Sequence, residues 1–200
     1  MLVRHAMTLA TGRRLGGLTP GIHLDDAGRR QAESTARRLV DLPVAAVYAS
    51  PLERTVETAK IIARPHRCRV RQRPGITEVD FGEWTNRPLG HLRRRNDWVH
   101  VQQTPSRFTF PSGESLRAAQ TRAVDAIEEL VAEHPDETIV VVSHADVIKA
   151  VVAFHLGMPL DTFQRLVVAP ASVTVLAFDA HNPARLLHFN DTGSVAGTAP

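Results

Sequence analysis

Short apolar runs alternate along this chain with segments of helical periodicity, and this alternation limits the possible folds more than any other feature. Val44 to Tyr48 and Thr138 to Val142 are compact apolar runs of the kind found in buried strands. Strands of this kind, separated by helices, form mostly parallel sheets that are covered on both faces. We therefore predict an α/β protein in which a single domain, residues 1–200, forms a three-layer α/β/α sandwich.

The remaining elements are predicted from cap residues and apolar spacing. A helix should begin within Ser50-Pro51-Leu52-Glu53, where the serine is the N-cap, the proline takes the first helical position and the glutamate completes a capping box. Residues 85–113 are polar but carry aromatic residues, so we expect a cap that folds over one end of the sheet. Residues 191–200 should form a frayed tail. The other expected helices are 25–40, 116–131 and 145–156, and the other expected strands are 1–3, 172–178 and 185–189.

The charge of the chain is nearly balanced despite an isoelectric point of about 9.7, because the sequence has 24 Lys and Arg residues and 21 Asp and Glu residues. Two arginine clusters remain, at residues 64–73 and 93–95. The first alternates as the solvated face of a strand would, and no pattern of stacking aromatic residues accompanies either cluster. We therefore expect no nucleic-acid partner.

The single cysteine, Cys68, excludes an internal disulfide and favours a reducing cytoplasm. The longest purely apolar run, Ile139 to Val142, is far shorter than the roughly 18 residues of a membrane helix. The chain also opens without an apolar signal segment. We expect a cytoplasmic protein with no membrane partner.

Polar residues follow the ends of the predicted strands, where open α/β sheets bind their ligands. Arg4 and His5 follow the first strand, Arg54 lies one turn into the helix after the second, and His144 follows the strand that ends at Val142. Helix N-termini offer free N–H donors, and guanidinium groups match phosphate oxygens. The sequence therefore predicts a site for a phosphoryl group.

These residues stand within longer motifs. The opening Leu2-Val3-Arg4-His5-Ala6-Met7-Thr8 resembles the Arg-His-Gly-Glu-Thr motif of the histidine phosphatase superfamily, also called phosphoglycerate mutase-like proteins. Other matching segments follow in the same order as in the family: Ser50 to Arg54 with Thr58-Ala59, Glu78 to Trp84, Gly113 to Ser115, and Val141 to Ala145. Within the superfamily the chain is most similar to a small actinobacterial-type group of phosphomutases and phosphatases, through Leu18 to Gly21, Asp146 to Ala150 and Phe163 to Arg165. The resemblance spans essentially the whole chain and implies a phosphoglycerate mutase-like sandwich.

Four residues depart from the family pattern. Ala6 and Ala145 replace the glycines that usually follow the two active-site histidines, and they preserve these turns if the backbone does not need a positive φ. Met7 replaces the usual glutamate, and Thr11 replaces an asparagine that often contacts phosphate. The Thr11 hydroxyl still offers a donor.

The resemblance implies hydrolysis of a small-molecule phosphomonoester through a phosphohistidine. His5 would be the nucleophile, with a pKa lowered by the flanking Arg4 and Arg54. Both arginines and His144 would hold the phosphoryl oxygens. Glu78 would protonate the leaving alkoxide and later take a proton from water. The other residues expected to border the substrate are Thr11, Arg13, Arg14 and Arg87. We expect no cofactor and no metal, since the sequence carries no metal-binding motif.

Several alternatives stay open at this point. Glu83 rivals Glu78 as the acid, because spacing does not separate two carboxylates five residues apart. A phosphomutase, a non-catalytic phospholigand-binding protein and a nucleic-acid binder are competing functions. The sequence determines neither the physiological substrate nor the oligomeric state, for which a homodimer is one alternative.

Overall fold

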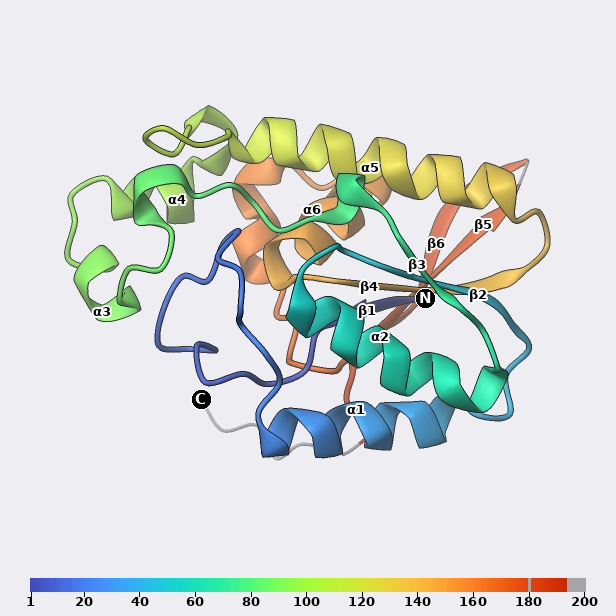
Figure 1. Ribbon diagram of the computed structural model, residues 1–200. Helices are drawn as coiled ribbons and strands as arrows, with labels where there is room; N and C mark the ends of the chain where they lie inside the picture. Colours follow the sequence, from blue (N-terminus) through green and yellow to red (C-terminus); the bar gives the residue numbers. More distant parts are fainter. Residues whose placement is uncertain (180, 194–200) are drawn as a thin grey trace.

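The computed structural model describes residues 1–179 and 181–193. Within these residues, the strands form a six-stranded sheet in the order β3-β2-β4-β1-β5-β6 (Figure 1). Strands β3, β2, β4 and β1 are parallel to one another, and β5 and β6 add an antiparallel pair at one side. The predicted mostly parallel sheet is confirmed. The strands are β1 (Leu2–Arg4), β2 (Val44–Ala49), β3 (Val70–Gln72), β4 (Thr138–Ser143), β5 (Val173–Asp179) and β6 (Asn182–Asp191).

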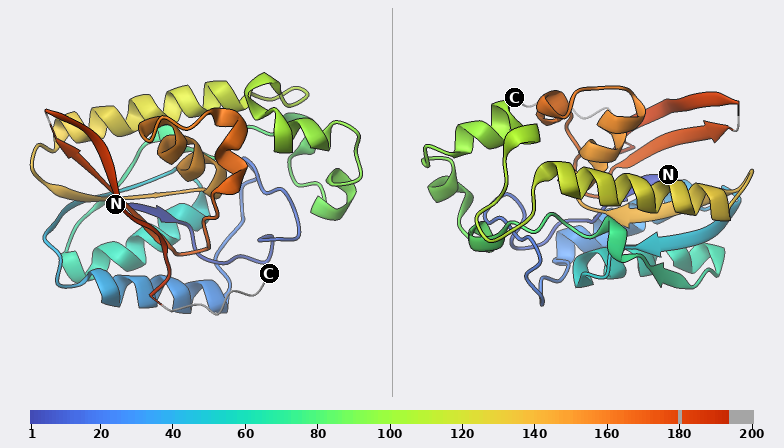
Figure 2. Two further views of the ribbon diagram at one scale, coloured as in Figure 1. Left: turned by 180° about the vertical axis from the view of Figure 1, so that it is seen from behind. Right: turned by 90° about the horizontal axis from the view of Figure 1, so that it is seen from above.

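Helices cover both faces of the sheet, as Figures 1 and 2 show. The helices are α1 (Asp26–Leu39) and α2 (Glu53–His66) on one face, and α5 (Leu116–Glu133) and α6 (Ala145–His155) on the other. Successive side chains of a strand point to opposite faces. Val140 and Val142 accordingly lie in the apolar cluster under α1 and α2, while Val141 lies in the cluster under α5 and α6. No helix within the described ranges is both long and apolar enough to cross a membrane.

The start of α2 differs from the prediction. The helix begins at Glu53 with Leu52 as its N-cap, and no side chain caps it. The Ser50 hydroxyl lies 2.8 Å from Nε2 of His144 instead, and the Glu53 carboxylate accepts a hydrogen bond from the N–H of Gly21 at 3.0 Å. The predicted capping box is wrong because both side chains bind partners in distant segments.

The arginine run at residues 64–73 does not form one face of a strand, so this prediction is also wrong. Helix α2 continues to His66, and Arg67 then turns the chain in a left-handed conformation with φ 54°. Strand β3 begins only after this turn. Arg73 pairs with Glu133, the last residue of α5. The run therefore passes from a helix through a turn into a short strand rather than along one strand face.

Residues 85–113 lie beyond the end of the sheet toward which β1 runs (Figures 1 and 2). They include the short helices α3 (Leu89–Leu92) and α4 (Trp98–Gln103). The indole rings of Trp84 and Trp98 stack with centroids 6.1 Å apart, and Phe110 packs edge-on against Trp84. These aromatic contacts fix the segment above the carboxyl ends of the strands. Of the tail expected at 191–200, residues 194–200 lie outside the described residues.

Candidate active site

The residues predicted to be catalytic come from separate elements and meet at the carboxyl ends of the parallel strands. Arg4 ends β1 and His5 follows it directly. Arg54 lies in the first turn of α2, and His144 is the N-cap of α6. Glu78 comes from the loop that follows β3. A cavity of about 210 Å³ lies between these elements, and Arg4, His5, Arg54 and Glu78 line it.

His5 is held in the form that a nucleophile needs. Its side chain is buried, and Nδ1 lies 2.8 Å from the backbone oxygen of Ala6. A carbonyl only accepts hydrogen bonds, so Nδ1 carries the hydrogen and the neutral ring keeps a lone pair on Nε2. Burial, together with the charges of Arg54 and Arg4, lowers the pKa of His5 to about 3. The ring is therefore neutral at pH 7.

Arg4 and Arg54 each use one nitrogen to fix the guanidinium group. Arg4 donates to the Val168 carbonyl at 2.6 Å, and Arg54 donates to the Gly17 carbonyl at 2.8 Å. Nε of Arg4 and one terminal nitrogen of Arg54 are buried and have no hydrogen-bond partner among the described residues. Buried donors of this kind are costly unless they meet an acceptor. An anion in the cavity would supply that acceptor.

His144 lies behind the wall of the cavity rather than on it. Its side chain is fully buried, and its ring centroid is 5.3 Å from that of His5. Nδ1 lies 3.4 Å from a terminal nitrogen of Arg54 and 3.7 Å from a carboxylate oxygen of Glu78. Nε2 contacts the Ser50 hydroxyl, which can either donate or accept. A guanidinium nitrogen only donates, so Nδ1 accepts from Arg54 and the ring hydrogen lies on Nε2, which donates to the Ser50 hydroxyl.

Glu78 is poised between its two protonation states. Burial and the nearby charge of Asp146 raise the pKa of Glu78 to about 7, against the opposing effect of Arg54 and Arg4. One carboxylate oxygen accepts a hydrogen bond from the N–H of Val79 at 3.0 Å. A carboxyl group with this pKa can donate a proton and take one back near neutral pH.

Glu83, the rival acid, lies outside the cavity. Its side chain is exposed and accepts a hydrogen bond from the Ser112 hydroxyl at 3.1 Å. Glu83 is not among the residues that line the cavity, whereas Glu78 is. The geometry therefore favours Glu78 as the acid.

Arg122 of α5 holds the loop that carries Glu78, a contact that sequence reasoning missed. Its guanidinium donates to the carbonyls of Gly75 at 2.9 Å, Thr77 at 2.8 Å and Glu78 at 3.0 Å. It also pairs with Glu114 at 2.6 Å. The separation of eight residues places Glu114 and Arg122 about two turns apart beside α5, and this spacing was the available signal.

Glu114 connects the same arginine to the chain that follows Glu78. Its carboxylate accepts a hydrogen bond from the N–H of Asp80 at 2.9 Å, and its own N–H donates to the Asp80 carbonyl at 2.9 Å. A side chain on Gly113 would collide with the Asp80 carbonyl, because a Cβ there would lie 2.4 Å from that oxygen. The Gly113-Glu114-Ser115 motif thus serves to fix the acid loop.

The residues predicted to border the substrate divide into two groups. Thr11 and Arg14 line the cavity, while Arg13 and Arg87 do not. The Thr11 hydroxyl lies 2.9 Å from that of Thr8 and helps to shape the loop. Arg14 donates to the carbonyl of residue 86 at 3.2 Å from an exposed position. Besides the buried Arg4 and Arg54, Arg14 is the arginine that lines the cavity.

The two alanines that replace family glycines fit their turns. Neither Ala6 nor Ala145 has a positive φ. The N–H of Ala6 donates to the Thr58 hydroxyl at 3.1 Å, and Ala145 lines the cavity. The substitution of alanine for glycine therefore needs no strained backbone at either site.

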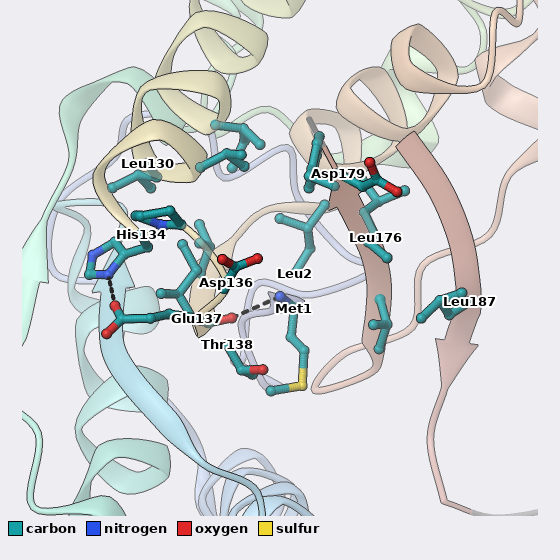
Figure 3. A pocket seen from close by; sticks show the side chains of 18 residues that line it. Met1, Leu2, Leu130, His134, Asp136, Glu137, Thr138, Leu176, Asp179 and Leu187 are labelled. Carbon is teal, nitrogen blue, oxygen red and sulfur yellow. Dashed lines mark hydrogen bonds and ion pairs between the residues drawn. The ribbon is translucent and has the colours of Figure 1, made fainter. Parts of the chain in front are cut away.

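A larger cavity, of about 620 Å³, lies at the opposite end of the strands (Figure 3). Its lining is mostly apolar and includes Leu2, Leu130 and Leu176. The amino group of Met1 donates to the Ile139 carbonyl at 2.8 Å beside it. None of the predicted catalytic residues lines this cavity. The smaller cavity therefore holds the candidate active site despite its size.

Among the described residues, no group of three or more His, Cys, Asp or Glu side chains is placed to hold a metal ion. The expectation of a reaction without metal stays a prediction.

Comparisons with known proteins agree with the geometry of the site. Residues 1–192 match the family model for the histidine phosphatase superfamily (branch 1). The chain belongs to this superfamily. It is 32% identical to phosphoserine phosphatase 1 of Hydrogenobacter thermophilus, over 88% of this chain and 84% of that protein. It is 30% identical to the probable phosphoglycerate mutase GpmB of Erwinia tasmaniensis, over 86% of this chain and 81% of that protein.

The fold of this histidine phosphatase superfamily member is also found in solved structures. The structure of Bacillus stearothermophilus YhfR matches with a TM-score of 0.88 and 28% identity, covering 95% of each chain. The predicted phosphoglycerate mutase-like sandwich is confirmed. The names of its relatives include both phosphatases and a probable mutase.

Proposed function

We propose that this protein is a phosphomonoester hydrolase that works without a metal and forms a phosphohistidine on His5. The observation that carries the proposal is the pairing of a neutral imidazole with two buried arginines, Arg4 and Arg54, whose free N–H groups lack an acceptor among the described residues. A phosphoryl group fills that need, because its oxygens accept several hydrogen bonds and its negative charge matches the guanidinium groups.

In the first step, Nε2 of His5 attacks phosphorus as the bond between phosphorus and the ester oxygen breaks. Arg4 and Arg54 stabilise the negative charge on the phosphoryl oxygens. His144, which lies behind the wall of the cavity, accepts a hydrogen bond from Arg54 and so helps to hold that guanidinium in place. Protonated Glu78 gives its proton to the departing oxygen, so the alcohol leaves neutral and Glu78 becomes a carboxylate.

In the second step, water attacks the phosphohistidine. The Glu78 carboxylate takes a proton from that water, which restores the protonated acid. The bond between phosphorus and Nε2 of His5 breaks, and inorganic phosphate leaves the neutral ring. Each residue returns to its starting state.

The substrate in this proposal is a small polar metabolite. The cavity of about 210 Å³ has room for a phosphoryl group and the part of the leaving group next to it. Arg14 at its edge favours a polar or anionic leaving group over a lipid. Phosphoserine, after which the Hydrogenobacter relative is named, is a candidate of the right size. The single cysteine, Cys68, favours a cytoplasmic location for this activity.

A phosphomutase is the second candidate, because a relative is named as a probable phosphoglycerate mutase. A mutase must protect its phosphohistidine from water until a second hydroxyl accepts the phosphoryl group. Adding 2,3-bisphosphoglycerate to the enzyme with 3-phosphoglycerate separates the two candidates. We expect inorganic phosphate as the main product, while rapid conversion to 2-phosphoglycerate with little phosphate released would favour the mutase.

The test of the hydrolase is turnover of nitrophenyl phosphate in excess chelator, with and without vanadate. We expect turnover to survive the chelator and to be inhibited by vanadate, which mimics five-coordinate phosphorus. Labelled substrate should leave acid-labile, base-stable phosphate on His5, and His5→Ala should abolish the label. His100→Ala, a change at an exposed histidine outside the cavity, is the control. Label on another residue type, or activity that needs a divalent ion, would contradict the proposal.

A further inference from the structure

The candidate active site holds a second acidic side chain that the proposed reaction does not use. Asp146 lies in the first turn of α6 and lines the same cavity as Glu78 and His5. Among the residues that line this cavity, Glu78 and Asp146 are the two carboxylates. The side chain of Asp146 is 24% exposed, whereas that of Glu78 is 13% exposed. Asp146 is therefore the more exposed of the two carboxylates that line the cavity.

One oxygen of Asp146 is fixed from behind. Lys149, one turn later in α6, places its ammonium 3.0 Å from Oδ1 of Asp146. The same ammonium donates to the Gln164 side chain at 3.1 Å and lies 5.6 Å from the centre of the Phe163 ring. Lys149 does not line the cavity. It therefore orients the Asp146 carboxylate without occupying the substrate space.

The other oxygen, Oδ2, receives no hydrogen bond from the residues that the structure describes. Its charge acts on the site, since Asp146 contributes to the raised pKa of Glu78. A carboxylate here repels an anionic group on the leaving group and attracts a cationic one. Arg14, which lines the same cavity, has the opposite preference. Beyond the two buried arginines and Glu78, the cavity lining thus presents one carboxylate acceptor, Oδ2 of Asp146, and one cation, Arg14.

We propose that Asp146 selects phosphomonoesters whose leaving group carries an ammonium group close to the ester, with Oδ2 accepting its hydrogen bond. This inference rests on the proposed hydrolase function and specifies its substrate class. The matching substrate is an amino-alcohol phosphate, and a carboxylate on the same carbon would face Arg14.

The test compares O-phosphoserine with 3-phosphoglycerate of the same configuration at C2. Both are primary alkyl phosphates with the same carboxylate, and they differ only in the ammonium or hydroxyl group at C2. We expect kcat/KM to be about 10- to 100-fold higher for phosphoserine, the usual range for a hydrogen bond to a charged group. In Asp146→Asn and in Asp146→Ser we expect this ratio to fall to within about threefold of unity.

The ratio isolates recognition from other effects of the charge. Loss of Asp146 also lowers the pKa of Glu78, but that change affects both alkyl substrates equally. Turnover of nitrophenyl phosphate shows that each variant is folded. Asp125→Asn, on the exposed side of α5, is the control and should keep the wild-type ratio.

Two results would overturn the inference in distinguishable ways. If both variants hydrolyse nitrophenyl phosphate and keep the wild-type ratio of kcat/KM for phosphoserine over 3-phosphoglycerate, Asp146 does not bind the ammonium group. The hydrolase proposal then stands. If the wild-type protein hydrolyses none of the three substrates, the proposed function itself fails.

Discussion

Replacing Glu78 by glutamine should slow the phosphorylation step, and the loss of rate should be larger for a more basic leaving group. With a pKa of about 7, half of the Glu78 carboxyls hold a proton at pH 7. A carboxyl at the ordinary value of 4.5 would hold one in about 300 molecules at that pH. The buried position of Glu78 therefore increases the acid form by about 150-fold, which Glu78→Gln removes together with the group itself.

The expected loss depends on the substrate. An alkoxide leaves poorly without a proton, so we expect Glu78→Gln to slow phosphorylation by alkyl phosphates by about 10²- to 10⁴-fold. A nitrophenolate leaves readily as an anion, so phosphoenzyme formation from nitrophenyl phosphate should change much less. Rapid quenching must time phosphorylation and dephosphorylation separately, because Glu78 also serves as the base in the second step.

The pH dependence gives an independent check. The acid must be protonated, so kcat/KM for an alkyl phosphate should fall about tenfold per unit as pH rises above about 7. His5 has a pKa of about 3 and stays neutral down to about pH 4, so it adds no break between pH 4 and 7. In Glu78→Gln the fall above pH 7 should disappear.

Glu83→Gln is the matched control, since this carboxylate is exposed and outside the cavity. An equal loss of phosphorylation rate for alkyl and nitrophenyl substrates would show that Glu78 acts through charge alone. If Glu78→Gln phosphorylates at the wild-type rate with alkyl phosphates and Glu83→Gln is strongly slowed, the assignment is refuted and Glu83 is the acid.

Three further predictions concern the support of the site and the fold. Arg122→Lys should lower kcat for alkyl phosphates by about 10- to 100-fold with KM within about threefold, because the acid loop loses its fork of hydrogen bonds; an unchanged kcat in steady-state kinetics would contradict this positioning role. Because folding raises the pKa of Glu78 from 4.5 to about 7, the contribution of this group to stability is lost as the pH rises through that range. In urea titrations the free energy of unfolding of Glu78→Gln should therefore exceed that of the wild type by up to about 3 kcal/mol at pH 8, and the two should be equal at pH 4. Ile62→Ala, which opens a cavity between α2 and the sheet, should cost about 2 to 5 kcal/mol in the same assay, and a cost under 1 kcal/mol would show that the core relaxes around it.

The sequence was informative where a residue's environment depends on its immediate neighbours. The apolar run of β4 fixes its burial on both faces, and parallel strands deliver His5 and His144 to one edge of the sheet. Ser50 was misread because its strong local capping pattern competes with a contact to His144, which is 94 residues away. Local propensity does not encode such a partner.

The loops explain the other differences. Arg13 and Arg14 are adjacent in sequence, yet only Arg14 lines the cavity. The chain just before them turns at Gly12 with φ 74°, and such a turn decides which side chain faces inward. The sequence did not reveal the role of Arg122, because its acceptors are backbone carbonyls of a distant loop. Only the packing of α5 against that loop brings the guanidinium to them.

The hydrogen bonds of the sheet continue directly into the residues that we propose to be catalytic. The N–H of His5 donates to the Ser143 carbonyl at 2.9 Å, and the N–H of Ser50 donates to the Val142 carbonyl at 3.0 Å. The register of the strands therefore sets the spacing of His5, His144 and Ser50. Residues 85–113 lie beyond the end of the sheet (Figures 1 and 2). Deletion of one residue in β2 or β4 would turn the following side chains to the wrong face. A change of length within residues 85–113, of which Leu89 lines the cavity, would leave this register intact. The register of the sheet thus separates the placement of the proposed catalytic groups from the length of the segment that covers the end of the sheet.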